Sequence, residues 1–384
     1  MNTTRTSSSV RTSRALVFAS FGAAALMLTG CGANALGPAQ ESATSDSTAG
    51  PSKGTIGVIL PETATSARWE AFDKPLLAAA LKKQGYESNI QNAQGDVQKF
   101  SSLADGMIAT QVKALIIASP NAEVGATVEQ KAQAAGIPTI DYDRLNTGGS
   151  ADYYVSFDNV EVGRLQGTAL AAALKDKPGA EVIQIEGAPD ENNSILFHKG
   201  QMEVLEPLYS SGKLKLVRDQ FTPGWDNQLG GTQFEQILTS NGGKVDGVIA
   251  ANDGMAGAVI TVLKKNGLNG VVPVTGQDAT LAGLQSILRG DQTMTVFKAI
   301  KLEAEAAAKL AAAVASKDTG AADSLATQTT TDPKSGRQIK SVLLKPQVVD
   351  KSNVKDVVEQ GYLTAEQLCS SDLVEACKIA GISK

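Results

Sequence analysis

Polar and aromatic side chains recur in the segments that follow the apolar stretches predicted to be β-strands. These residues are Arg68, Trp69, Asp143, Arg144, Asn193, Trp225, Asn252, Asp278 and Lys298. Ligands of parallel α/β sheets bind at the carboxyl ends of the strands, so we expect these side chains to converge. A single Asp or Asn at such a position often only caps a helix. The recurrence after nearly every predicted strand favours a binding site.

The chemistry that these side chains share is hydrogen bonding to a neutral polyol such as a pyranose. Carboxylates and amides accept hydrogen bonds from hydroxyl groups, Arg and Lys donate them, and each charge-assisted bond contributes about 1.5–3 kcal/mol. Flat indole rings can cover the apolar C–H faces of a sugar. Trp69 and Trp225 are the two tryptophans of the chain. They follow strands in the first and second halves of the fold, and we expect them to enclose one ligand from opposite sides.

Residues that other chemistries need are missing from the sequence. It contains no Walker A motif and no GxGxxG after a predicted strand. His198 is the only histidine and falls inside a predicted helix, which disfavours a Ser-His-Asp hydrolase and a zinc site. We therefore expect no catalytic residue, metal or cofactor. The enzymatic alternative is a carbohydrate enzyme that uses Asp143 and Asp278 as paired carboxylates.

Short apolar segments alternate with longer amphipathic ones from Thr55 onward. The predicted strands cover residues 56–60, 114–118, 137–140, 155–157, 182–185, 214–217, 245–251, 271–274, 294–297 and 342–344. The predicted helices cover residues 68–83, 124–135, 160–174, 193–208, 227–239, 255–265, 279–288 and 300–314. Uninterrupted apolar strands indicate sheets that are covered on both faces. Two such series in succession predict an α/β fold of two doubly wound parallel-sheet lobes.

The N-terminus has the features of an export signal. Arg5, Arg11 and Arg14 precede an uncharged apolar run over residues 15–29, which is shorter than the roughly 20 residues of a membrane-spanning helix. The run ends in Leu28-Thr29-Gly30-Cys31, which resembles the lipobox of bacterial lipoproteins. On that resemblance, residues 1–30 are removed, Cys31 carries a lipid, and the Ser- and Gly-rich residues 31–53 form a flexible tether.

The charge of the exported chain limits its partners. The whole chain has 35 Lys and Arg against 40 Asp and Glu, and removal of residues 1–30 takes away three Arg and no acid, which leaves a net charge of −8. No basic block remains, so nucleic acid is not an expected partner. Cys369 and Cys377 lie close together in an exported chain, where disulfides persist. We expect them to pair, with two free thiols as the alternative.

Several short motifs occur in an order that resembles a known family. They are residues 66–69 (SARW), 141–144 (DYDR), 156–159 (SFDN), 192–193 (NN), 200–202 (GQM), 251–253 (AND), 276–279 (GQDA) and 292–296 (QTMTV), the last leading to Lys298. With them, residues 54–345 resemble the sugar-binding lipoproteins of ABC importers that have the type I periplasmic-binding-protein fold, and most closely those that bind D-xylose. The loop at Pro61-Glu62 and Phe221 depart from the xylose-binding pattern.

The resemblance implies an organisation and a site. Residues 54–156 and 299–340 would form the N-terminal lobe, and residues 157–298 and 341–384 the C-terminal lobe with its tail. A three-strand hinge is expected near Phe157, Lys298 and Ser341. The residues expected to bind sugar hydroxyls are Arg68, Asp143, Arg144, Asn193, Asn252, Asp278 and Lys298, while Trp69 and Trp225 would stack on the ring.

The function expected from the sequence is that of a non-enzymatic, monomeric receptor on the extracytoplasmic face of the cell membrane. It would bind one monosaccharide, D-xylose or a related aldose, and deliver it to an ABC permease. A sugar sensor for a membrane kinase or chemoreceptor could use the same site. A binder of nucleosides or furanosyl signal molecules is a further alternative, although an aromatic content of 4% offers few rings for a purine.

Overall fold

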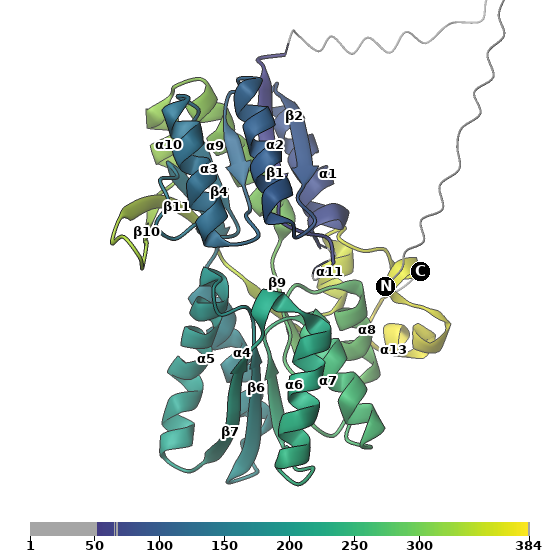
Figure 1. Ribbon diagram of the computed structural model, residues 1–384. Coiled ribbons are helices and arrows are strands. Elements are labelled where there is room, and N and C mark those ends of the chain that lie inside the picture. Colours follow the sequence, from purple (N-terminus) through teal and green to yellow (C-terminus); the bar gives the residue numbers. More distant parts are fainter. Residues whose placement is uncertain (1–51, 65, 67, 383–384) are drawn as a thin grey trace, which may run out of the picture. The chain divides into compact units, whose positions relative to one another are not determined.

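The computed structural model describes residues 52–64, 66 and 68–382. The predicted signal peptide, the lipid attachment at Cys31 and most of the predicted tether lie outside the described residues. From Ser52 onward the described chain forms two α/β lobes, the upper and lower halves of Figure 1. Within these residues, no helix combines the length and the apolar character that a membrane span requires.

The N-terminal lobe is built on a seven-stranded sheet in the order β10-β11-β5-β4-β3-β1-β2, in which β10 alone runs antiparallel to its neighbour. Its strands are β1 (Thr55–Leu60), β2 (Glu87–Asn92), β3 (Leu115–Ile117), β4 (Thr139–Tyr142), β5 (Tyr153–Phe157), β10 (Gln328–Thr331) and β11 (Gln338–Leu344). Its helices are η1 (Trp69–Asp73), α1 (Lys74–Lys83), α2 (Val97–Ala109), α3 (Ala122–Ala134), α9 (Ile300–Ala315) and α10 (Thr319–Leu325). Val58 and Leu60 of β1 pack against α1 and α9, whereas Ile59 packs against α2 and α3, so both faces are covered.

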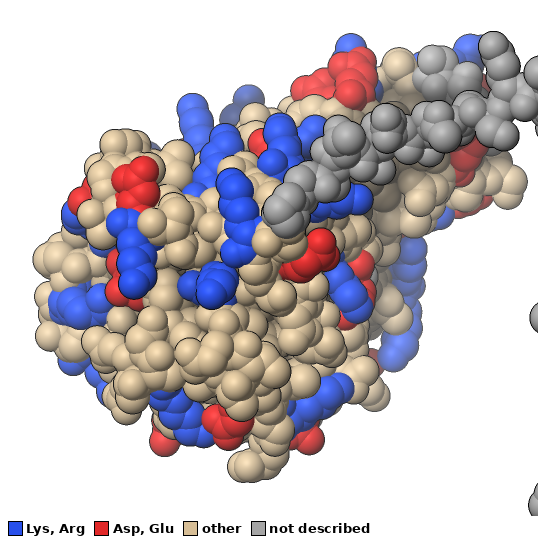
Figure 2. Space-filling view, turned by 90° about the horizontal axis from the view of Figure 1, so that it is seen from above, with Lys and Arg blue, Asp and Glu red and all other residues tan. Residues whose placement is uncertain are grey.

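The C-terminal lobe contains the strand groups β7-β6-β8 and β12-β9. Its strands are β6 (Ala180–Glu186), β7 (Leu214–Phe221), β8 (Gly247–Ala250), β9 (Met294–Phe297) and β12 (Gln347–Asp350). Its helices are α4 (Asn159–Ala173), α5 (Asn192–Ser210), η2 (Pro223–Trp225), α6 (Asn227–Ser240), α7 (Asp253–Lys265) and α8 (Leu281–Arg289). Figure 2, which looks onto the end of the N-terminal lobe, shows basic and acidic side chains interspersed over that face.

The prediction of a β-strand over residues 271–274 is wrong, because this segment forms a turn followed by a single β-bridge. The amides of Val271 and Val272 donate to the carbonyl of Leu268 and so complete a turn after α7. Pro273 has no N–H to offer a ladder, and only Val274 makes a parallel bridge, to Val248 of β8. The chain beyond it is bonded to β9, so this irregular segment still joins the two strand groups.

The helix predicted for residues 68–83 divides into two parts. It opens with η1, a single π-helical turn, and continues as α1, where Pro75 occupies the first turn. Single π turns within helices occur most often at functional sites. Here the turn carries Trp69 at its beginning and Asp73 at its end.

The chain passes between the lobes three times. The passages lie between Phe157 and α4, between β9 and α9, and between β11 and β12. The third falls later than the expected boundary at Ser341, because β11 stays paired with β5 as far as Leu344 opposite Phe157. The amide of Asp158 donates to the Leu344 carbonyl at 2.9 Å, which ties the first passage to the third.

The C-terminal tail packs onto the C-terminal lobe and contacts the second passage. It comprises α11 (Lys355–Glu359), α12 (Ala365–Leu368), η3 (Ser371–Leu373) and α13 (Val374–Ile379), and it contains a disulfide between Cys369 and Cys377. Tyr362 places its ring 4.8 Å from that of Phe297 and 5.9 Å from that of Phe72. Its hydroxyl accepts a hydrogen bond from the Lys301 amide at 2.8 Å.

Helices α4 and α5 cross at contact distance because glycines lie at the crossing. A Cβ atom on Gly163 would lie 1.8 Å from the Phe197 carbonyl oxygen, and one on Gly200 would lie 1.9 Å from that of Val160. These obstacles are backbone atoms, which cannot turn aside as a side chain can. The crossing therefore fixes α5, whose first turn carries Asn193.

We expect Gly200→Ala to destabilise the protein by about 1–3 kcal/mol, because the methyl group would force two helices apart. The change should appear as a lower midpoint of urea unfolding at an unchanged m-value. Gly257→Ala in α7 is the matched control, since nothing lies within 4 Å of a Cβ there and Ala is the better helix former. Equal midpoints for the two variants would contradict the close crossing.

Candidate functional site

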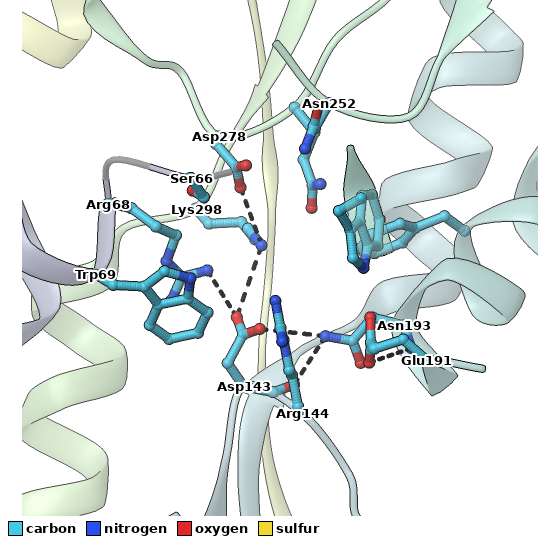
Figure 3. A pocket seen from close by; sticks show the side chains of 13 residues that line it. Ser66, Arg68, Trp69, Asp143, Arg144, Glu191, Asn193, Asn252, Asp278 and Lys298 are labelled. Atoms are coloured by element: carbon cyan, nitrogen blue, oxygen red, sulfur yellow. Dashed lines mark hydrogen bonds and ion pairs between the residues drawn. The ribbon is translucent and has the colours of Figure 1, made fainter. Parts of the chain in front are cut away.

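A cavity between the two lobes is lined by every residue that the sequence singled out as a ligand contact. The space between its lining side chains, counted together with the solvent that opens into it, is about 380 Å³. The predicted residues on its wall are Arg68, Trp69, Asp143, Arg144, Asn193, Trp225, Asn252, Asp278 and Lys298. They come from both lobes and from the second passage between them, and Figure 3 shows the labelled side chains directed toward one common space.

Asp143 is the centre of the charged groups in this cavity. Its Oδ2 atom lies 2.7 Å from Nη1 of Arg68 and 3.7 Å from Nζ of Lys298 (Figure 3). Burial alone would raise the pKa of the Asp143 carboxyl, but Arg68, followed by Lys298 and Arg144, outweighs burial and holds that pKa well below its usual range. Asp143 is therefore ionised throughout the pH range in which the protein would work.

Arg68 is surrounded by three carboxylates and is itself 4% exposed. In addition to Asp143, it donates to both oxygens of Asp73, at 2.8 and 3.0 Å, and to Glu303 at 3.1 Å. Burial raises the pKa of Asp73, and burial together with Asp143 raises the pKa of Glu303 well above its usual value, in each case against the effect of Arg68. A protonated Glu303 would leave Asp73 and Asp143 to balance Arg68 and Lys298.

Lys298 links Asp143 to Asp278 across the passage between β9 and α9. Its Nζ atom lies 3.2 Å from Oδ1 of Asp278 (Figure 3). That Oδ1 atom has no hydrogen-bond partner among the described residues, so the contact is an ion pair without a directed hydrogen bond. The three charged side chains form a line across the cavity, with the cation in the middle.

Asn193 joins the lobes directly. From the first turn of α5 it donates through Nδ2 to the Asp143 carbonyl at 2.9 Å and to the Asp143 carboxylate at 3.2 Å. Its own Oδ1 accepts a hydrogen bond from Asn159 at 2.8 Å, and its backbone amide donates to Glu191. The amide side chain is thus oriented on both sides, which fixes the donor that faces Asp143.

Three residues on the cavity wall adopt left-handed backbone conformations. Asp143 has a φ of 61°, Trp225 of 56° and Asp278 of 92°. Such conformations cost on the order of 1–3 kcal/mol for residues other than glycine and persist where the surroundings impose them. At Asp143 the surroundings are hydrogen bonds from its amide to the Val155 carbonyl and from the Ser156 hydroxyl to its own carbonyl, both at 2.8 Å.

A buried hydrogen-bond network supports Arg144. Its Nη1 atom donates to the Ser119 carbonyl at 3.0 Å, and the Ser119 hydroxyl donates to the side chain of Asn146. Asn146 in turn donates to both Glu129 and Asp141, at 2.6 Å each. Burial raises the pKa of both carboxyl groups. Neither carboxyl group lines the cavity, and both are connected to Arg144 through Asn146 and Ser119.

The aromatic side chains provide apolar walls but are not equivalent. Trp69 has the guanidinium groups of Arg68 and Arg144 over its ring, with centroid distances of 4.5 and 5.4 Å. Trp225 packs edge-on against Phe197 at 6.2 Å, with its outer ring atoms against Gly187. The arrangement places one indole in the N-terminal lobe and the other in the C-terminal lobe, at the same cavity.

Several polar atoms of this wall have no hydrogen-bond partner among the described residues although they are buried. They are Ser66 Oγ, Trp69 Nε1, Trp225 Nε1 and Gln277 Oε1. An unpaired buried polar group costs about 1–3 kcal/mol. Four of them at one cavity suit a ligand that offers both donors and acceptors, as clustered hydroxyl groups do.

Four further residues line the cavity, and the sequence prediction omitted them: Ser66, Glu191, Phe197 and Gln277. Phe197 lies four residues after Asn193 on α5, a spacing that places both on one helical face. Ser66 and Gln277 belong to motifs that the sequence analysis singled out. Glu191 has no comparable sequence signal, because it is the N-cap of α5 and accepts the Asn193 amide. In the described part of the chain, no cluster of His, Cys, Asp and Glu could hold a metal ion.

Comparisons with known proteins agree with this geometry. The periplasmic binding protein domain family matches residues 56–319. The D-xylose-binding periplasmic proteins of Haemophilus influenzae and Escherichia coli are 36% and 37% identical, over 78% of this chain and 88% of each relative. A solute-binding protein of an ABC transporter from Clostridium phytofermentans, solved with β-D-glucose, superposes with a TM-score of 0.75 at 30% identity and covers 82% of this chain and 99% of its own.

We expect Glu303→Gln to change how stability depends on pH. Because the folded-state pKa of Glu303 is raised, the folded protein binds the proton more tightly, and wild-type stability should fall as pH rises above about 4.5 through the folded pKa. The variant lacks this titrating group, so its free energy of unfolding should rise relative to that of the wild type as pH increases over this range. Urea unfolding between about pH 5 and pH 8 measures the difference. Glu235→Gln, at an exposed site on α6, is the control, and parallel profiles for wild type and Glu303→Gln would contradict the prediction.

Proposed function

This chain belongs to the periplasmic binding protein family, and we propose that it captures one monosaccharide between its lobes and delivers it to an ABC permease. The observation that carries the proposal is the interlobe cavity, where buried donors and acceptors from both lobes have no hydrogen-bond partner in the part of the chain that the structure describes. It is a binding protein and not an enzyme, like the relatives that it matches.

The charges on the wall favour a neutral ligand. Three cations, Arg68, Arg144 and Lys298, face three carboxylates. A phosphate or carboxylate ligand would meet repulsion from the acids, and an ammonium ligand repulsion from the cations. Hydroxyl groups donate to one set and accept from the other, so a polyol can use both sets at once.

Division of the contacts between lobes provides a mechanism. A sugar that meets one lobe alone gains only part of its hydrogen bonds, and it gains the rest when the lobes close around it. Such a ligand shifts the population toward the closed form by its difference in affinity for the two forms. The bond from Asn193 to Asp143 lies where this closure would occur and would hold the closed form together.

D-xylose or a related aldose is the ligand class that we propose. The relatives from H. influenzae and E. coli are named for D-xylose, and the structure from C. phytofermentans holds β-D-glucose. Indoles from both lobes line the cavity, which suits the apolar faces of one pyranose ring. We further propose that Cys31 carries the lipid that keeps a monomeric receptor at the extracytoplasmic face of the membrane, near its permease.

Isothermal titration calorimetry with a panel of aldopentoses and aldohexoses tests the proposal. We expect a dissociation constant near micromolar for at least one of them, equivalent to about −8 kcal/mol. Inositol and ribonucleosides serve as neutral comparison ligands. Absence of heat with every aldose would overturn the assignment, and tight binding of a nucleoside would replace it.

We expect Trp225→Ala to weaken binding of the best sugar by at least tenfold, because it removes the apolar wall of the C-terminal lobe. Calorimetry gives the affinity, and circular dichroism checks the fold. Phe221→Ala is the matched control. Phe221 is the last residue of β7, four residues before Trp225, and it does not line the cavity. If both variants lost affinity equally, Trp225 would have no direct contact with the sugar.

A further inference from the structure

We propose that Asp253, which does not line the cavity, is a positioning residue that holds Gln277 and Asp278 in place at the sugar site. The inference rests on the proposed function for the identity of the ligand. Its geometric part rests on the contacts of one buried carboxylate with the turn over residues 276–280, which leads from the end of the irregular segment into α8.

This turn is strained. Asp278 and Ala279 are consecutive, neither is glycine, and their φ angles are 92° and 47°. Each left-handed residue of this kind is unfavourable by itself and requires surroundings that impose it. Asp278 is one of the pair that contacts Lys298, so a relaxed turn would displace a charged group of the cavity.

Asp253 is bonded to the turn on both sides of the strained pair. Its amide donates to the Gln277 carbonyl at 3.0 Å. Its Oδ2 atom accepts from the Thr280 amide at 2.8 Å and from the Thr280 hydroxyl at 3.1 Å. Gln277 immediately precedes the pair and Thr280 immediately follows it. One residue therefore fixes both ends.

The other carboxylate oxygen reaches the middle of the turn through a second side chain. Oδ1 of Asp253 accepts from the Thr295 hydroxyl at 2.8 Å, and Thr295 Oγ1 accepts from the Ala279 amide at 3.1 Å. Gln292 also donates to Oδ1, at 2.8 Å. Both carboxylate oxygens are thus engaged, and each of them constrains the backbone beside Asp278.

The space around this carboxylate exists only because two neighbours are glycines. A Cβ atom on Gly276 would lie 2.2 Å from Oδ1 of Asp253, and one on Gly283 would lie 2.2 Å from Oδ2. A larger residue at either position would have to expel the carboxylate. Gly283 belongs to α8 and lines no part of the cavity, so it offers an independent way to move Asp253.

The ionised carboxyl group of Asp253 does not stabilise the fold. Burial raises the pKa of Asp253 to about 7, against the hydrogen bonds from Gln292, Thr280 and Thr295. The folded protein therefore binds this proton more tightly than the unfolded chain does, and the stability gained from it is lost as pH rises from about 4 to about 7. What the carboxylate provides is the set of four acceptor contacts that shape the turn.

The test combines Asp253 with Asp278 in a double-mutant cycle measured by calorimetry with D-xylose, or with whichever aldose the wild type binds best. We expect Asp253→Ala to weaken binding at least tenfold and Asp253→Asn to weaken it less, because the amide keeps one acceptor oxygen. In the Asp278→Ala background, Asp253→Ala should add less than twofold. Fully additive losses would overturn the inference.

Asp332→Ala is the matched control for a purely structural effect. Asp332 is also buried and also organises a turn, through the amides of Gly148 and Lys334, but it lies outside the cavity. We expect its removal to lower stability and to leave sugar affinity within about twofold of the wild type. An equal loss of affinity in Asp332→Ala and Asp253→Ala would refute a positioning role.

Hydrogen–deuterium exchange of the ligand-free protein judges the inference separately from the proposed function. We expect Asp253→Ala and Gly283→Ala to accelerate exchange at the Ala279 and Thr280 amides at least tenfold, and Asp332→Ala to leave them unchanged. Unchanged protection in Asp253→Ala would overturn the positioning role whatever the ligand. Faster exchange in a protein that binds no aldose would uphold the role while the sugar assignment fails.

Discussion

The ion pair between Asp143 and Arg68 is the contact on which the rest of the cavity depends. Asp143 also meets Lys298 from the passage between β9 and α9 and Asn193 from the C-terminal lobe, so one carboxylate touches both lobes and a connection between them. A buried charge is tolerated only where opposite charges and hydrogen bonds compensate it. The arrangement of cations around Asp143 therefore fixes where the lobes can meet and which groups a ligand encounters.

Backbone strain and unpaired polar atoms occur together at the wall of the cavity, although neither is confined to it. The left-handed residues Asp143, Trp225 and Asp278 all line the cavity, and the indole nitrogens of Trp69 and Trp225 are buried without a hydrogen-bond partner among the described residues. Each of these features lowers the stability of the protein by itself. Binding sites often have such features. Groups that are already oriented before the ligand arrives do not have to be ordered on binding, which reduces the entropy cost of binding. The glycine crossing of α4 and α5 and the network behind Arg144 supply the rigidity that this requires.

The sequence allowed the two-lobed α/β fold and the place of the ligand residues to be predicted, because apolar strands and the polar residues after them follow a regular pattern. It failed where tertiary contacts override that pattern. β2 has the polar sequence ESNIQN and was missed, since an edge strand needs no apolar face on both sides. Residues 271–274 are apolar but form a turn and a single bridge around Pro273. Glu191 escaped notice because nothing in its sequence context distinguishes a helix cap from a cavity wall.

The tail bears on how the receptor would open. Tyr362 touches Phe72 in the N-terminal lobe and Phe297 at the end of β9, and it accepts the Lys301 amide at the beginning of α9. These partners lie on either side of the second passage, and Tyr362 itself lies beyond the residues that the family match covers. A rotation of one lobe against the other cannot preserve all three contacts. If the lobes separate, loss of these contacts would oppose the separation, so the C-terminal segment would favour the closed form of the empty protein.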